Sequence, residues 1–236
     1  MDYEVVMNNT VRIGMKAPDF EALTTAGNIK LSNYIGKWVV LFSHPGDFTP
    51  VCTTEFISFQ KMIKFFDERN ACLLGLSIDS NASHLAWLDN IYANTGTKIT
   101  FPIIADKNMA VARKYGMIAP DVSTTETVRN VYIIDDKQII RAILIYPLTT
   151  GRYIPEVIRI IDALQISDTQ KVVTPANWIP GSSVIVPSPK TFANIEKNEN
   201  NPELECIDWY LCFKKNKERI NNKRTEEKVD NNREVK

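Results

Sequence analysis

The sequence predicts an α/β fold, in which a mixed sheet has helices on both faces, followed by a C-terminal extension. β-rich apolar runs alternate with segments of helical periodicity between residues 38 and 165, as in layered α/β domains. Near the end of this region, the polar residues 135–138 separate two apolar runs, which is typical of a hairpin turn. Prolines then interrupt residues 167–190, where a packed helix is not expected.

Each expected element follows from a local pattern. Residues 10–35 contain several turn residues and are expected to be a docking segment with turns. Strands are predicted for the apolar runs at residues 38–42, 72–78, 131–134 and 139–145. Helices are predicted where apolar residues recur at helical spacing, at about residues 52–69, 83–93, 108–115 and 154–165.

The residue composition of the chain changes after residue 166, where prolines become frequent. We assign residues 10–166 to one domain, 167–213 to a C-terminal dimerisation arm, and 214–236 to a charged tail that could be disordered. A plain linker is the alternative for the proline-rich part of the arm. We favour the arm, because the segment is too apolar for a solvated linker; its apolar residues include Trp178, Ile179, Val184, Ile185 and Val186.

The charge composition limits the kinds of partner that the sequence predicts. Lys and Arg number 28, as do Asp and Glu, so the formal net charge is zero and no basic surplus indicates a nucleic acid or an anionic membrane. No apolar run reaches the 20 or so residues of a membrane span, and the N-terminus lacks the features of a signal peptide. We therefore expect a cytoplasmic protein, in which four cysteines are redox or catalytic groups.

Cys52 lies at a junction between a strand and a helix. The apolar run at residues 38–42 precedes it, prolines and a glycine mark the turn, and a helical pattern follows. Cys52 should therefore occupy the first turn of a helix, where unpaired backbone N–H groups and the helix dipole favour a thiolate. Many cysteines are inert core residues, so the position alone leaves its reactivity open.

The segment HPGDFTPVCTTE, residues 44–55, resembles the active-site loop of peroxiredoxins, which are thiol peroxidases. The family pattern is a proline, a threonine, two further residues and the peroxidatic cysteine, here Pro45, Thr49 and Cys52. The start of the domain, GMKAPDF, is similar to the start of thioredoxin-like peroxidases, and the extension resembles a long subfamily that includes one-cysteine and archaeal-type enzymes. The resemblance covers about residues 10–213 and implies a thioredoxin-like fold.

The resemblance also implies roles for residues around the thiol. Cys52 would be the nucleophile, and Pro45 would shield it from water or only shape the turn. The Thr49 hydroxyl would hydrogen-bond the thiolate or the peroxide; a helix cap is the alternative. Arg129 matches the family's active-site arginine, which stabilises the thiolate and binds peroxide, and Arg152 matches a supporting arginine.

Three further side chains are interpreted with this site. Glu55 could bridge the two arginines. His44 is either a catalytic base or, as we favour, a hydrogen-bond partner, since a preformed thiolate needs no base. His84 resembles a histidine in a family helix and is expected to be structural. With two histidines far apart in the sequence, we expect no metal site and no cofactor.

Two C-terminal cysteines, Cys206 and Cys212, match the archaeal-type subfamily, in which this pair supplies the resolving thiol from the partner subunit. If residues 203–213 were helical, the two sulfurs would lie about 9 Å apart along the axis, and a direct bond would need local unwinding. Cys212 is our preferred resolving residue, with Cys206 as its exchange partner. Cys72 lies in an apolar run and is expected to be buried without a function.

The sequence thus predicts a thiol peroxidase that reduces hydrogen peroxide and organic hydroperoxides and is recycled by a thioredoxin-like donor. The resemblance implies homodimers that assemble into a ring, which we expect to be a homodecamer. A redox sensor or chaperone is the alternative function. A disulfide oxidoreductase is disfavoured, because Cys52 is not part of a Cys-x-x-Cys motif. The lipase-like serine motif of the bifunctional one-cysteine enzymes is missing at residues 35–39, so no phospholipase activity is expected.

Overall fold

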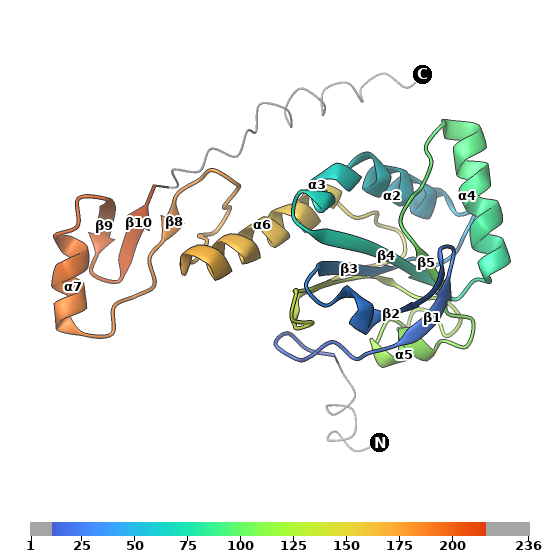
Figure 1. The fold of residues 1–236 in the computed structure, drawn as a ribbon, viewed down its shortest axis with the longest axis horizontal. Helices are drawn as coiled ribbons and strands as arrows, with labels where there is room; N and C mark the ends of the chain where they lie inside the picture. The colour runs from blue at the N-terminus through green and yellow to red at the C-terminus, as the bar shows by residue number, and fades with distance from the viewer. Residues whose placement is uncertain (1–10, 216–236) are drawn as a thin grey trace, which may run out of the picture. The chain divides into compact units, whose positions relative to one another are not determined.

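The computed structural model describes residues 11–215, and these divide into two compact units, with the division between Ile158 and Arg159. The first unit holds a sheet of seven strands in the order β2-β1-β5-β4-β3-β6-β7 (Figure 1). Its strands are β1 Glu21–Thr24, β2 Gly27–Lys30, β3 Trp38–Ser43, β4 Ala71–Ser77, β5 Ile103–Ala105, β6 Arg129–Ile134 and β7 Ile140–Tyr146.

The sheet is mixed, as predicted. Strands β3, β4 and β5 run parallel to one another, whereas β6 pairs antiparallel with both β3 and β7. The polar turn at residues 135–138 joins β6 to β7, which confirms the predicted hairpin. The segment expected to dock with turns, residues 10–35, contains the β1–β2 hairpin, whose strands were not predicted. Strand β5 was not predicted either.

Helices cover both faces of this sheet, with α2 and α4 on one side and α5 on the other (Figure 1). The helical elements are η1 Leu31–Tyr34, α2 Pro50–Lys61, α3 Ile63–Asp67, α4 Asn81–Thr95, α5 Ala110–Lys114 and α6 Ile154–Gln170. The single helix predicted at residues 52–69 is therefore two, because the backbone leaves the helical conformation at Met62. Helix α6 is longer than predicted and crosses the division between the units.

Strand β3 is buried along its whole length, and its alternate side chains enter two cores. Val39 and Leu41 belong to the core that includes α5. Phe42 points into an aromatic cluster with α2, where it stacks on Phe59 at a centroid distance of 4.3 Å. Helix α2 approaches β4 so closely that a Cβ at Gly75 would lie 3.2 Å from a ring carbon of Phe56. This aromatic packing holds the first turn of α2 in place relative to the sheet.

The second unit contains a small antiparallel sheet in the order β8-β10-β9 and one further helix. Its elements are β8 Val184–Ile185, α7 Phe192–Glu199, β9 Leu204–Asp208 and β10 Leu211–Lys214. The helical conformation considered for residues 203–213 is wrong, because these residues form the β9–β10 hairpin. Lys214, where the tail was expected to begin, is the last residue of β10, and the tail from residue 216 lies outside the described residues.

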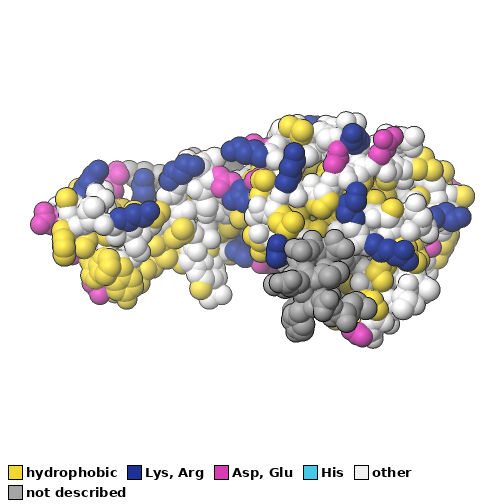
Figure 2. Space-filling view, turned by 90° about the horizontal axis from the view of Figure 1, so that it is seen from below, with side chains coloured by type: hydrophobic (Ala, Val, Ile, Leu, Met, Phe, Trp, Pro, Cys, Tyr) yellow, Lys and Arg dark blue, Asp and Glu magenta, His cyan; other side chains and the backbone are white. Residues whose placement is uncertain are grey.

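Part of the apolar content of the extension packs within the second unit. Val172, Trp178 and Val184 form a small core there, so the segment is not a solvated linker. Other apolar side chains remain on the surface, where they gather on this unit (Figure 2). The most exposed of these are Phe192 at 87% and Ile207 at 74%. Within residues 11–215, no helix has the length and hydrophobicity needed to span a bilayer.

Candidate active site

Cys52 lies in the first turn of α2, as predicted, and its side chain is fully buried. Thr49 is the N-cap residue and Pro50 the first residue of the helix, where a missing N–H costs nothing. The first intrahelical bond runs from the Thr53 N–H to the Thr49 carbonyl. The backbone amides that precede Thr53 in this first turn have no intrahelical acceptor, and such a helix end favours negative charge nearby.

Arg129, the first residue of β6, brings a positive charge to this thiol. Its Nη1 donates to the Cys52 sulfur at 3.3 Å and to Oε2 of Glu55 at 2.8 Å. Its Nε and Nη2 both donate to the Leu148 carbonyl, at 3.0 and 2.8 Å. The guanidinium is thus held from two sides, with one nitrogen directed at the sulfur.

Arg152 also binds Glu55, but its hydrogen bonds go to other groups than the sulfur. Its Nε and Nη2 form a bidentate pair with the Glu55 carboxylate at 2.8 and 2.7 Å. Its Nη1 donates to the carbonyls of Ser43 and Asn130, and its guanidinium lies over the Phe42 ring. Glu55 therefore contacts both arginines, and Arg152 holds Glu55 in place.

The charges of this buried cluster balance only when the thiol is ionised. Arg129, Arg152 and Glu55 all have side chains that are at most 3% exposed. Two guanidinium groups and one carboxylate leave one uncompensated positive charge, which is costly away from water. A negative charge on the Cys52 sulfur is what would cancel this positive charge.

The Thr49 hydroxyl does not cap α2. It donates to the Gly46 carbonyl at 2.8 Å, and no capping bond from the helix reaches it. Because its proton is committed to Gly46, the hydroxyl oxygen can only accept a further hydrogen bond, such as one from an incoming hydroperoxide. Pro45, one residue before Gly46 in the same loop, is buried.

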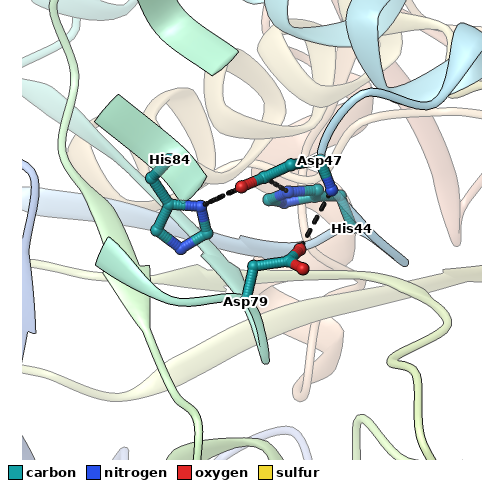
Figure 3. A group of neighbouring side chains, drawn as sticks. All are labelled: His44, Asp47, Asp79 and His84. Atoms are coloured by element: carbon teal, nitrogen blue, oxygen red, sulfur yellow. Dashed lines mark hydrogen bonds and ion pairs between the residues drawn. The ribbon is translucent and has the colours of Figure 1, made fainter. Parts of the chain in front are cut away.

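His44 and His84 both contact Asp47, which was not given a role from the sequence (Figure 3). The Asp47 carboxylate lies 3.0 Å from Nε2 of His44 and 2.8 Å from Nδ1 of His84. Nε2 of His84 faces the Ile104 carbonyl at 3.2 Å, and Asp79 accepts from the Asp47 backbone N–H at 2.9 Å. His44 thus serves a hydrogen-bond network here, and its remaining nitrogen, Nδ1, is buried without a hydrogen-bond partner.

Burial and these contacts set the charges of the two loop residues. Burial lowers the pKa of His44 below its ordinary value, although the contact with Asp47 opposes this. Burial also opposes ionisation of Asp47, but hydrogen bonds from His44 and His84 outweigh it and hold the pKa of that carboxyl well below its usual range. Asp47 is therefore a carboxylate and His44 a neutral ring at neutral pH.

His44, Asp47, Asp79 and His84 also form the one group among residues 11–215 that could hold a metal ion. Their nitrogen and oxygen atoms all lie within 4.8 Å of one another. However, the distances of 2.8 to 3.0 Å between Asp47 and the two rings are those of hydrogen bonds. An ion would have to replace the protons in these contacts and push apart atoms that already lie at hydrogen-bond distance, so the geometry favours a hydrogen-bonded cluster.

The match to known families agrees with this geometry. A model of the AhpC/TSA family matches residues 13–143, and a model of the C-terminal domain of 1-Cys peroxiredoxin matches residues 163–199. The chain is 62% identical over 205 residues to "Peroxiredoxin 2" of Caldanaerobacter subterraneus subsp. tengcongensis, an alignment that covers 86% of this chain and 93% of the relative. This chain belongs to the peroxiredoxin family. It is a thiol peroxidase with the thioredoxin-like fold and an antioxidant function.

Comparisons with other peroxiredoxins support the same family assignment. That of Aquifex aeolicus is 54% identical over 215 residues, which covers 86% of this chain and 96% of the relative. The solved structure of a yeast mitochondrial 1-Cys peroxiredoxin aligns with a TM-score of 0.77 at 42% identity, covering 87% of this chain and all of that one. A cysteine-to-serine mutant of peroxiredoxin 6 of Arenicola marina aligns at 0.79 and 35% identity over 88% of this chain and all of the other.

Replacing Glu55 with glutamine should destabilise the protein strongly. The E55Q change leaves two buried guanidinium groups without a carboxylate, and losing one partner of a buried ion pair costs about 3 to 5 kcal/mol. Denaturant unfolding of the reduced protein measures this. Glu68, whose side chain is 69% exposed beside Arg69, gives the control: E68Q should cost less than about 1 kcal/mol. Equal losses in the two variants would contradict the cluster's role.

His44 should make stability depend on pH. Its folded-state pKa is lowered, so below about pH 6.5 the unfolded chain binds a proton that the folded ring resists, and stability is lost as the pH falls. The H44Q variant keeps a donor near Asp47 but does not titrate. Unfolding free energies of both proteins from pH 7.5 to 5 should therefore fall more steeply for the wild type. Parallel curves would show that His44 does not resist protonation.

Proposed function

We propose that Cys52 is the peroxidatic cysteine. Its thiolate attacks the terminal oxygen of a hydroperoxide, the O–O bond breaks, and the sulfur becomes a sulfenic acid while the leaving oxygen takes a proton to form water or an alcohol. The observation that carries this assignment is the 3.3 Å contact between Arg129 and the sulfur in a cluster that is neutral only with a thiolate. Thiol trapping of Cys52 before and after one equivalent of peroxide tests it.

The surrounding residues would act on the peroxide. Thr49 would accept a hydrogen bond from the hydroperoxide and orient it for attack. Arg129 would bind the peroxide oxygens and stabilise the charge that develops on the leaving oxygen. Pro45 would exclude water from the thiolate. Arg152 and Glu55 would hold Arg129 at the sulfur, which is a supporting role consistent with their contacts.

The second unit would complete the catalytic cycle. Cys206 and Cys212 face each other across the β9–β10 hairpin and form a disulfide, with Cα atoms 3.9 Å apart. The hairpin removes the separation that a helix would have imposed, so the expected local unwinding is unnecessary. We infer that Cys212 attacks the sulfenic acid of Cys52 in a partner subunit, releasing water. Cys206 then attacks Cys212, freeing the Cys52 thiolate and leaving the hairpin disulfide for a dithiol donor to reduce.

Two cysteine variants separate these steps. In C206S the exchange cannot occur, so peroxide treatment should accumulate a disulfide-linked dimer through Cys52 and Cys212. In C212S that dimer should be absent. Non-reducing gels after one equivalent of peroxide measure both, and C72S, which changes a half-buried thiol whose pKa is raised by burial, should behave as the wild type. A dimer of equal yield in C212S would move the resolving role to Cys206 or Cys72.

Peroxiredoxins oligomerise and draw electrons from thioredoxin-like donors. For this chain we infer a homodimer formed by the arm at residues 167–213, ring-shaped homodecamers, a thioredoxin-like reductant and a cytoplasmic location. The exposed apolar side chains of the second unit support association. Light scattering of the reduced protein tests the ring. Sustained peroxide turnover with a thioredoxin system and NADPH would exclude the alternative of a sensor or chaperone.

A further inference from the structure

We propose that His84 is a positioning residue: with a proton on both ring nitrogens it holds Asp47, and Asp47 in turn fixes the tautomer of His44. The three residues come from two parts of the first unit that are far apart in the sequence (Figure 3). His84 lies in the first turns of α4, whereas Asp47 and His44 lie in the loop between β3 and α2 that leads to Cys52. The inference rests on the proposed role of Cys52, because it concerns the loop that shapes that site.

The contacts of His84 require two donors on one ring. Nδ1 lies 3.0 and 2.8 Å from the two oxygens of Asp47, and Nε2 lies 3.2 Å from the Ile104 carbonyl. A backbone carbonyl can only accept, and Asp47 is a carboxylate, so each nitrogen must carry a proton. The ring is fully buried, where a cation needs a paired anion. Asp47, with a side chain that is 2% exposed, is that anion.

Asp47 is held from a second direction. Its backbone N–H donates to Oδ2 of Asp79 at 2.9 Å, and the Ser77 hydroxyl donates to the same oxygen at 2.8 Å. A Cβ at Gly46 would lie 3.7 Å from that oxygen, so the chain passes close to Asp79 there. These contacts tie the loop to the end of β4 and the start of α4.

The geometry then allows one protonation pattern for the His44 ring. Nε2 faces Asp47 at 3.0 Å and must donate, while Nδ1 has no partner. A second proton on Nδ1 would be a buried, unsatisfied donor, so Nδ1 is bare. The ring stacks on Trp87 of α4 at 5.2 Å and meets the Phe56 ring edge to face at 4.8 Å. His44 is thereby held as a neutral ring whose single accepting nitrogen is fixed in direction.

Through these contacts, α4 positions the loop between β3 and α2 that leads to Cys52. Trp87 also donates from Nε1 to the Thr53 hydroxyl at 3.3 Å, beside Cys52. The His84–Asp47 pair fixes the loop whose later residue Thr49 begins α2. Loss of the pair should therefore let Thr49 and Pro45 move relative to the thiol, which slows attack on peroxide without removing the thiol.

Nitrogen NMR of the reduced full-length protein, labelled with ¹⁵N-histidine, tests the protonation states directly. The chain has two histidines, so four ring nitrogens are observed, and protonated and bare nitrogens differ widely in chemical shift. We expect both nitrogens of His84 and Nε2 of His44 to be protonated and Nδ1 of His44 to be bare. The H44Q variant assigns the signals. A bare nitrogen on His84 at neutral pH would overturn the proposal, whether or not the protein reacts with peroxide.

Stopped-flow reaction with hydrogen peroxide tests the positioning. The H84L variant should lose about tenfold to a hundredfold in the second-order rate constant. In H84N, the amide can still donate to Asp47, and part of the loss should be recovered. The control, L85A, changes the next residue of α4, which is half exposed, and should react as the wild type. A wild-type rate in H84L would also overturn the proposal, whereas an unreactive wild type would instead contradict the role of Cys52.

Discussion

Replacing Cys52 with serine is expected to reduce the rate of reaction with hydrogen peroxide by at least about three orders of magnitude, because a serine hydroxyl is not ionised at neutral pH and is a weak nucleophile. The side chain is fully buried, and serine is close to cysteine in size, so the fold should be retained. Stopped-flow fluorescence of the fully reduced protein measures the rate.

The matched control for Cys52 is Cys72. It lies in β4, is half buried, and has a pKa raised by burial, so it is a thiol at neutral pH. The C72S variant should react with peroxide at the wild-type rate. If C72S loses the reaction and C52S keeps it, the assignment of the peroxidatic cysteine is wrong.

Replacing Arg129 with methionine is expected to slow the same reaction by about a hundredfold to a thousandfold, the usual effect of removing one donor that stabilises developing charge. Methionine fills similar space but supplies neither the bond to the sulfur nor the positive charge. The remaining pair, Arg152 with Glu55, is already neutral, so it offers no positive charge to the developing negative charge of the reaction. Single-turnover kinetics with a peroxide series measures this loss.

Two further arginine variants show which property matters. R129K keeps the charge but cannot reach the sulfur, Glu55 and the Leu148 carbonyl together, so its rate should fall between those of the wild type and R129M. R113M removes an exposed arginine from α5 and should have no effect. A rate for R129M within about threefold of the wild type would contradict its role as the main charge-stabilising group.

Elements that follow from a local sequence pattern were predicted well. The apolar run of β3 and the helical spacing after Cys52 placed the thiol in the first turn of α2. The same spacing continues past residue 62, which is why the break between α2 and α3 was not visible. Strands β1 and β2 are four residues each, and their sequences, EALT and GNIK, lack the alternation of polar and apolar residues that identifies a half-buried strand.

Contacts between residues that lie far apart in the sequence could not be predicted from local patterns. Arg129 and Arg152 lie 77 and 100 positions from Cys52 and are brought to it by the sheet and the loop after β7, and only the resemblance to peroxiredoxins singled them out. Asp47 and His84 are 37 positions apart, and neither has a neighbouring residue that indicates the other. Strand β10 likewise pairs with β8, which lies almost thirty residues earlier, and a short sequence window does not contain both strands.

Mass spectrometry after a single turnover tests the central claim most directly. The C206S/C212S double variant cannot resolve the oxidised cysteine, so one equivalent of hydrogen peroxide should leave the first oxidation product in place. We predict one added oxygen per chain, located on Cys52 and captured by a sulfenic-acid reagent, at a rate equal to that of the wild type. Oxygen on Cys72, or no rapid oxidation of either cysteine, would contradict the assignment of Cys52 as the peroxidatic residue.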